Sequence, residues 1–293
     1  MARVLADPTP AEAFQATNQH YELPVELFTA YLDERLKYSS GVYAHEKSTL
    51  DEAQTAKLHF VAAELGLTGG EELLDVGCGW GSLILFMATE YGCRATGVTP
   101  SSTQAVHIGR LARELGVADR IRLRVGSYSE LPAEGGYDAV TMLGSIVHMP
   151  DRVSVLAKAY RNLRRGGALY LSESCFRSEA AYREFAERPG TIGVTEGIFG
   201  FADMVPLSTL VAAAESAGFS LTGLTDLTAH YKRTIEDWER RATENRAAVD
   251  AAVPGMFDQL VTYLRTANAG WGYTTKHYAL SARKTRLGPE GPL

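Results

Sequence analysis

The fold is decided by residues 71–82, which read EELLDVGCGWGS. The apolar residues of 72–76 predict a buried strand, and the apolar run that follows Ser82 predicts a helix. The turn between these two elements contains Gly77, Gly79 and Gly81. Glycines let a ligand approach the backbone, and a helix N-terminus offers unpaired N–H groups. A strand, a glycine-rich turn and a helix in this order predict a nucleotide-binding corner.

The glycine spacing is G-x-G-x-G rather than the dinucleotide fingerprint G-x-G-x-x-G, and Asp75 stands two residues before the first glycine. A carboxylate there repels a phosphate but suits a cationic group, such as the ammonium and sulfonium of S-adenosylmethionine (SAM). The spacing and Asp75 argue against a nicotinamide reductase. The alternative is a glycine-rich turn that binds no ligand.

Composition excludes several classes of protein. The 293 residues carry a net charge of −6, which argues against a nucleic-acid partner. No apolar run approaches the roughly 18 residues of a membrane span, and no signal-peptide pattern occurs. The three cysteines fit neither a disulfide framework nor a zinc site, and the scattered histidines suggest no metal. We therefore expect a cytoplasmic enzyme without an integral membrane segment or a metal. The sequence is compatible with a homo-oligomer but does not decide the oligomeric state.

Strand and helix patterns alternate along the chain and predict an α/β fold, a doubly wound, Rossmann-like sheet. The seven expected strands lie near 72–76, 94–99, 121–125, 137–143, 167–173, 218–225 and 276–283, the last as an antiparallel edge. Helices are expected after Pro24 and over 50–65, with Thr49 and Glu52 as a capping box. Further helices are expected near 82–91, 101–115, 151–163, 207–217, 234–247 and 255–268.

These elements predict a helical lid over residues 1–65, a ligand-binding domain over 66–284 and a loose tail over 285–293. Residues 175–206 do not follow the alternation and are rich in aromatic residues. We expect this insertion to cover the active site.

Ligands in such a sheet bind beyond the carboxyl ends of the strands. The predicted second strand ends at Thr99, where an acidic residue would ordinarily hold ribose hydroxyls. Ser127 and Tyr128 follow the third strand, and Gly144 follows the fourth. Tyr128 is a candidate for the adenine face, or alternatively an ordinary aromatic residue at the rim.

Several motifs together resemble the cyclopropane fatty acid synthase and mycolic acid methyltransferase family over residues 20–284. They are His20-Tyr21-Glu22-Leu23, Tyr38-Ser39, Thr49-Leu50-x-x-Ala53-Gln54-x-x-Lys57, residues 74–81, Gly97-Val98-Thr99 with Gln104, and His230-Tyr231-x-x-Thr234. The resemblance implies the seven-stranded fold of class I SAM-dependent methyltransferases, with an N-terminal helical segment over the cofactor. The implied cofactor residues are Tyr38, Ser39, Asp75, Gly77, Cys78, Gly79, Trp80, Gly81, Thr99, Gln104, Ser127, Tyr128 and Gly144.

The family's bicarbonate site is divergent here. The resemblance implies that a Cys, a Glu, a His and a Tyr hold the anion, but Ser40, Val147 and Ser172 stand at the first three positions and only Tyr231 is retained. Serine hydroxyls cannot replace a carboxylate and an imidazole as a proton path. These departures argue against cyclopropane formation while leaving methyl transfer intact.

Methyl transfer needs mainly positioning, because the sulfonium is already a good leaving group. Three residues are candidates for removing a proton: His148, Glu173 and Tyr231. Each has a structural alternative, because His148 could cap the next helix, Glu173 could be a surface acid and Tyr231 could serve packing. The expected acceptor wall contains Tyr21, Ser40, Val147, Phe199 and Phe201.

The leading hypothesis is a SAM-dependent methyltransferase that acts on a small, largely apolar acceptor, with carbon methylation of an alkene-bearing lipid, isoprenoid or polyketide favoured. The alternatives are methylation of nitrogen or oxygen in a specialised metabolite, or true cyclopropanation of an acyl chain. A second class is a SAM-binding protein without catalysis, which turnover to S-adenosylhomocysteine (SAH) would distinguish.

Overall fold

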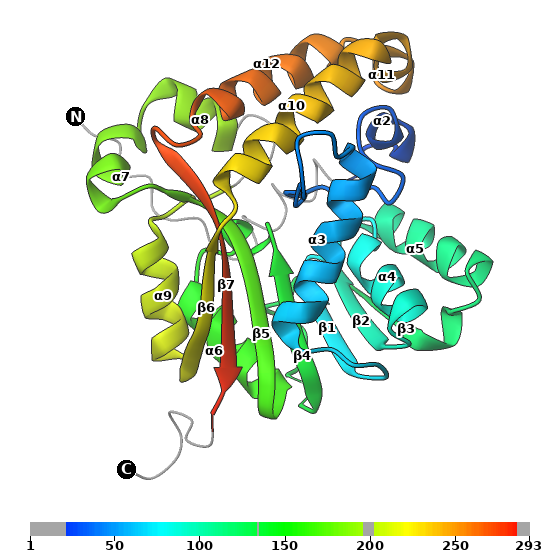
Figure 1. The fold of residues 1–293 in the computed structure, drawn as a ribbon, viewed down its shortest axis with the longest axis vertical. Coiled ribbons are helices and arrows are strands. Elements are labelled where there is room, and N and C mark those ends of the chain that lie inside the picture. Colours follow the sequence, from blue (N-terminus) through cyan, green and yellow to red (C-terminus); the bar gives the residue numbers. More distant parts are fainter. Residues whose placement is uncertain (1–21, 134, 196–201, 286–293) are drawn as a thin grey trace.

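A computed structural model describes residues 22–133, 135–195 and 202–285 of the chain (Figure 1). Its centre is a seven-stranded sheet in the order β3-β2-β1-β4-β5-β7-β6. The strands are β1 (Glu72–Val76), β2 (Arg94–Thr99), β3 (Ile121–Val125), β4 (Tyr137–Leu143), β5 (Leu163–Phe176), β6 (Phe219–Asp226) and β7 (Thr275–Lys284). The predicted seven-stranded, doubly wound sheet is confirmed.

The last strand, β7, is antiparallel as expected, but its predicted place at the edge of the sheet is wrong. It lies between β5 and β6 and pairs antiparallel with both. Its residues Ala279, Leu280 and Ala282 are all buried, whereas most residues of β6 are half-buried or exposed. The weak alternation of 276–283 reflects burial on both faces, which a central strand has and an edge strand lacks.

Helices cover both faces of the sheet (Figure 1). On one face lie α3 (Leu50–Leu65), α4 (Ser82–Glu90) and α5 (Ser102–Glu114), packed on β-strand residues such as Leu73 and Tyr170. On the other lie α6 (Arg152–Asn162) and α9 (Leu207–Ser216), packed on residues such as Val76 and Leu171. A short helix, η1 (Ala118–Arg120), precedes β3.

The N-terminal part of α3 has the capping box that the sequence predicts. The Thr49 hydroxyl accepts from the Glu52 N–H, and the Glu52 carboxylate accepts from the Thr49 N–H at 2.8 Å. Gly66 ends the helix in the left-handed conformation, with φ of 71°. Helix α3 packs on the sheet. Within the expected lid, the residues that lie near the glycine-rich turn are therefore those that precede α3. The division into domains itself stays a prediction.

The helix after Pro24, α2 (Val25–Thr29), is shorter than the apolar spacing up to Leu36 suggests. It gives way to a loop in which the Asp33 carboxylate accepts hydrogen bonds from the N–H groups of Arg35 and Lys37, at 3.0 and 2.7 Å. A side chain that binds its own backbone in this way competes with helix formation.

A third helical layer stands above the ends toward which the parallel strands run (Figure 1). It contains α10 (Thr228–Glu244), α11 (Arg246–Ala252) and α12 (Met256–Ala269), which share an apolar cluster with α2 and Trp80. Helix α10 begins six residues before the predicted start at 234, so it includes Tyr231. Trp80 of the glycine-rich turn joins this cluster, with its ring centroid 5.1 Å from that of Phe28 in α2.

The insertion of residues 175–206 starts with the last two residues of β5 and continues into α7 (Glu179–Phe185) and α8 (Pro189–Thr195). Phe176, Ala181 and Phe185 form a small separate core, with Met204 packed against it. The segment returns to the sheet at Val205, whose carbonyl accepts from the Phe176 N–H at 3.1 Å.

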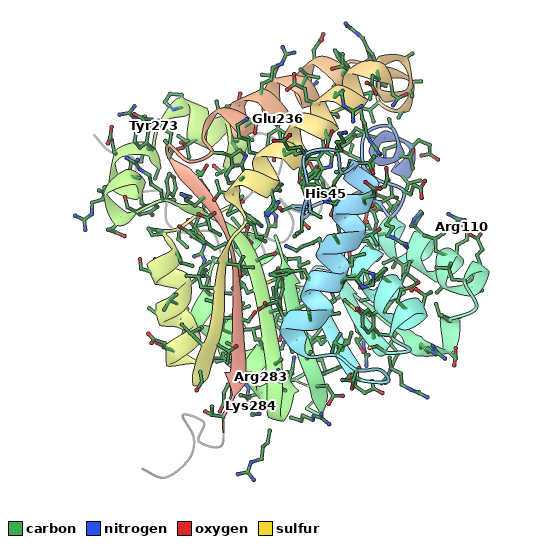
Figure 2. The ribbon with its side chains drawn as sticks, viewed as in Figure 1. His45, Arg110, Glu236, Tyr273, Arg283 and Lys284 are labelled. Carbon is green, nitrogen blue, oxygen red and sulfur yellow. The ribbon has the colours of Figure 1, made fainter. Side chains whose placement is uncertain are left out.

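The opposite end of the sheet is closed by charged side chains (Figure 2). Lys284 donates to the carbonyls of Tyr160 and Leu163, and Arg283 donates to those of Leu65 and Gly166. These contacts join the end of β7 to α3 on one face of the sheet and to α6 on the other. The candidate site lies at the opposite end of the sheet.

Candidate active site

The turn between β1 and α4 has the backbone that its glycines predict. Gly77, Gly79 and Gly81 have φ of 80°, 55° and 85°, a region that L side chains rarely adopt. A Cβ on Gly77 would lie 2.4 Å from the Cβ of Ser145, whereas a Cβ on Gly79 would meet no atom within 4 Å. Gly77 is thus required for close packing, and Gly79 faces open space that a ligand can use.

A cavity of about 290 Å³ opens beside this turn. It runs from the loop before α3 past the carboxyl ends of β1, β2, β3 and β4 to one side of α6. Ten predicted residues line it: Tyr38, Gly77, Cys78, Gly79, Trp80, Gln104, Ser127, Tyr128, Gly144 and His148. The structure therefore brings together residues that lie as much as 110 positions apart in the sequence (38 to 148).

Four other predicted cofactor residues are not among the residues that line this cavity: Ser39, Asp75, Gly81 and Thr99. Thr99 is buried and its hydroxyl donates to the Gln104 amide oxygen, so it orients a lining residue. Gly81 packs against Ile108 of α5. Thr99 and Gly81 thus support the lining of the cavity without forming it, and a role of these four residues in cofactor binding stays a prediction.

Asp75 lies behind the turn, fully buried, and its carboxylate accepts a hydrogen bond from Thr141 at 2.7 Å. Burial raises the pKa of Asp75 to about 6, although the positive charge of Lys37 and the Thr141 hydrogen bond act in the opposite direction. Lys37 itself lines the cavity. Sequence reasoning missed Lys37, because its place in the loop gives no periodic signal.

The segment just before α2 reaches the end of β2. The Glu22 carboxylate accepts from the Ser102 N–H at 2.9 Å and from the Thr103 hydroxyl at 2.6 Å. These hydrogen bonds join the N-terminal segment to the first turn of α5, where a carboxylate also complements the helix dipole.

At the other end of the cavity, Tyr128 is held from two sides. Its hydroxyl accepts from the Asn162 amide at 2.9 Å, and the Lys158 ammonium lies 4.7 Å from its ring centroid. Lys158 donates to the carbonyls of Tyr128, Ser129 and Leu131. Lys158 thus fixes the loop that carries Tyr128, and stacking of Tyr128 on an adenine stays a prediction.

Glu173 is not a surface acid, since only 5% of it is exposed. Its two carboxylate oxygens accept from the backbone N–H groups of Val147 and Ser174, at 3.3 and 2.9 Å. Burial raises the pKa of Glu173 to about 7, despite these hydrogen bonds and the nearby charge of Arg152. A carboxyl that titrates near neutral pH is suited to accept a proton.

His148 follows Val147 at the end of the short helix η2 (Ile146–His148) and lines the cavity. It does not cap the next helix, because Asp151 does so by accepting from the Ser154 N–H at 3.0 Å. Glu173, near the end of β5, therefore lies beside η2, which carries Val147 and His148.

Tyr231 lies in an aromatic group at the start of α10. Its ring centroid is 4.6 Å from that of His277, 5.0 Å from Trp271 and 6.0 Å from Trp238. Trp238 in turn packs 5.3 Å from Tyr38, which lines the cavity. The packing interpretation of Tyr231 is thus supported, and a role in catalysis is untested.

Two of the positions at which the anion site diverges, Ser40 and Ser172, are fully buried. Ser40 is buried and donates to the Gly41 carbonyl at 2.8 Å. Within the described residues, six buried polar atoms nearby have no hydrogen-bond partner; they belong to Ser39, Gln54, Lys57, Tyr170, Ser172 and His277. Sequence reasoning missed Lys57 and His277 as members of this buried set, because they come from elements distant in the chain.

Three predicted substrate residues, Tyr21, Phe199 and Phe201, lie outside the described residues. Among the residues that are described, no group of three or more His, Cys, Asp or Glu side chains is arranged to hold a metal ion. No helix in that same part of the chain is both long and apolar enough to cross a bilayer.

The fold and the cavity are those of the class I SAM-dependent methyltransferases, a class of enzymes. The family model described as mycolic acid cyclopropane synthetase matches residues 9–278. The chain belongs to this family, whose methyl donor is SAM. The resemblance found in the sequence is therefore confirmed, as is the cofactor.

The structure is similar to that of the mycolic acid cyclopropane synthase CmaA1 complexed with SAH and CTAB, with a TM-score of 0.84 and 25% identity over 92% of this chain and 98% of that one. The chain is 28% identical to a probable fatty acid methyltransferase of Pseudomonas putida, over 82% of this chain and 61% of the relative. It is 29% identical to sphingolipid C9-methyltransferase 2 of Gibberella zeae, over 83% of this chain and 47% of the relative. The chain thus spans about half to three fifths of these two relatives.

Proposed function

We propose that the protein transfers the methyl group of SAM to a carbon atom of an alkene-bearing lipid. The observation that carries this proposal is the buried carboxyl of Glu173, held beside Val147 and titrating near pH 7. Attack on SAM by an alkene leaves a carbocation, which must then lose a proton. A basic group in an enclosed, largely apolar setting meets that need.

The proposed reaction has two steps. The π electrons of the alkene form a carbon–carbon bond to the methyl group while the carbon–sulfur bond breaks, which releases neutral SAH. The neighbouring carbon of the former alkene becomes a cation. Glu173 as a carboxylate then accepts a proton from a carbon next to the cationic one, and the electrons of that carbon–hydrogen bond form a new double bond. His148, which lines the cofactor cavity, is the second candidate for this proton.

Two further observations support a lipid acceptor. The insertion of 175–206 adds a small apolar core of Phe176 and Phe185 at the end of β5, the strand that carries Glu173. Two of the relatives are named as methyltransferases of fatty acids and of sphingolipids, which are lipids. We place the protein in the cytoplasm, acting on a small-molecule acceptor; whether it forms a homo-oligomer stays open.

The test is SAH formation with matched acceptors. An unsaturated acyl lipid should support turnover, whereas its saturated counterpart should not, because only the alkene supplies the attacking electrons. Glu173→Gln keeps the shape but removes the base, and should lower kcat by about 10²–10⁴-fold. Equal SAH formation with both lipids, or an undiminished kcat in the variant, would refute the proposal.

A further inference from the structure

Arg152 is a buried arginine near Glu173 that takes no part in the two steps of the proposed reaction. It is the first residue of α6. Arginine is not deprotonated in proteins, and it is seldom buried unless it has a charged partner. The positive charge of this residue therefore acts on the acidic groups that lie around it.

The partner of Arg152 is Asp203, near the end of the insertion of 175–206. The guanidinium lies 2.9 Å from the Asp203 carboxylate and also donates to the Asp203 backbone carbonyl. The Asp203 side chain is 38% exposed, whereas the Arg152 side chain is 9% exposed. Because water screens the more exposed carboxylate, Asp203 neutralises only part of the charge that Arg152 exerts on the interior.

Hydrogen bonds join this ion pair to Glu173 through one residue, Val147 of η2. The Val147 N–H donates to the Glu173 carboxylate at 3.3 Å, and the Val147 carbonyl accepts from the Asp203 N–H at 2.8 Å. A further donor of Arg152, its Nε–H, is buried and has no acceptor among the described residues. The end of the insertion, the ion pair and Glu173 thus form one connected unit in which Asp203 does not saturate the guanidinium.

The ionisable groups around Glu173 differ in the charge that they can carry. Cys175 follows in β5, and Tyr278 is the register partner of Glu173 in β7, but a thiol and a phenol are never cationic. His148 of η2 is cationic only when protonated. Among these groups Arg152 is the permanent cation. Burial raises the pKa of Glu173 to about 7, and the Arg152 charge acts in the opposite direction.

We propose that Arg152 is a positioning residue for Glu173: its charge favours the carboxylate form that accepts the proton, and Asp203 limits how much of that charge Glu173 experiences. The end of the insertion thereby sets the basicity of Glu173 as well as the place of Val147. The role of Glu173 as a base rests on the proposed function, whereas the effect of Arg152 on the carboxyl can be measured without an acceptor.

The test is a titration of the Glu173 carboxyl itself. Protein labelled with ¹³C at the glutamate side-chain carboxyls is followed by NMR from about pH 5 to pH 9, and the Glu173 signal is the one that Glu173→Gln lacks. The titration is repeated with Arg152→Met, Arg152→Lys and Asp203→Asn. The control is Arg165→Gln, which removes an exposed arginine near the other end of β5.

Arg152→Met should raise the midpoint of the Glu173 titration by about one pH unit, because a nearby opposite charge is lost. Asp203→Asn should lower the midpoint by about half a pH unit, because the Arg152 charge is then no longer shared. Arg152→Lys should stay near the wild type because it keeps the charge, and Arg165→Gln should match the wild type. Arg152→Met and Asp203→Asn break the same ion pair, so opposite shifts distinguish an effect of charge from a loss of structure.

Shifts in the same direction would overturn the proposal, as would an unchanged midpoint in either variant. If Arg152→Met does not fold, Asp203→Asn decides alone, since a midpoint that stays or rises in that variant contradicts the proposal. A failure of the proposed function is seen separately, as equal SAH formation with the saturated and the unsaturated lipid, and it leaves these titrations unchanged.

Discussion

The protonation of Glu173 should make a contribution to stability that falls as pH rises from 5 to 8, and Glu173→Gln should remove that contribution. The pKa of Glu173 is raised from an ordinary 4.5 to about 7 by burial. Between these two values the folded state keeps the proton on Glu173 while the unfolded state has lost it. This contribution to stability therefore decreases with pH in this window and levels off above pH 7.

The magnitude follows from the shift. A difference of about 2.5 pKa units corresponds to about 3 kcal/mol, because each unit is worth about 1.4 kcal/mol. At pH 5 the raised pKa of Glu173 lowers the free energy of unfolding by less than about 1 kcal/mol. The remaining loss of about 2–3 kcal/mol therefore occurs between pH 5 and pH 8. Glutamine is neutral throughout, so the variant lacks this term, although it loses one acceptor for the N–H groups of Val147 and Ser174.

Urea unfolding of wild type and variant at pH 5, 6, 7 and 8 measures the difference directly. The constant loss of one hydrogen bond shifts the variant's curve equally at each pH, so only the change with pH tests the argument. The wild type should lose about 2–3 kcal/mol more than Glu173→Gln between the extremes. Parallel pH dependences would refute the account of Glu173 as a buried carboxyl that titrates near neutral pH.

Three further predictions concern the turn and a helix cap. Gly79→Val should leave a folded protein by circular dichroism but weaken SAH at least tenfold in calorimetry, because the side chain enters open space beside the cavity; wild-type affinity would contradict this placement of the ligand. Gly77→Ala should cost about 2–5 kcal/mol in urea unfolding, because its Cβ would lie 2.4 Å from that of Ser145, and Ser145→Gly should recover part of the loss. Asp151→Ala should cost about 1 kcal/mol in urea unfolding by removal of the cap on α6, and an unchanged stability would contradict the assignment of Asp151 as the cap.

Much of the fold was predictable because its signals are local. Glycine spacing and apolar runs predict the strand, turn and helix at residues 71–82. The capping box of α3 is likewise contained within four consecutive residues. The order of strands around β7 depends on which long-range pairings bury the most surface. The local sequence pattern does not determine which strands pair. For this reason the edge position predicted for residues 276–283 was wrong.

The site was predictable where its residues follow strand ends, as Gly77, Tyr128 and Gly144 do, because parallel strands bring such residues together. Lys37 and Lys57 gave no such signal. One lies in a loop set by Asp33, and the other sits on a helix in which a lysine is ordinarily solvated. The burial of Glu173 likewise could not be predicted from the sequence, because it depends on the packing of η2 beside β5.

The central claim, carbon methylation, is tested most directly by tracing the transferred methyl group. The protein is incubated with SAM labelled with ¹³C in the methyl group and an unsaturated acyl lipid, and the product is examined by NMR. The account predicts that the label appears as a methyl group bonded to carbon in a product that still contains a double bond. A label on nitrogen or oxygen, or in a cyclopropane methylene with protons at unusually high field, would contradict it.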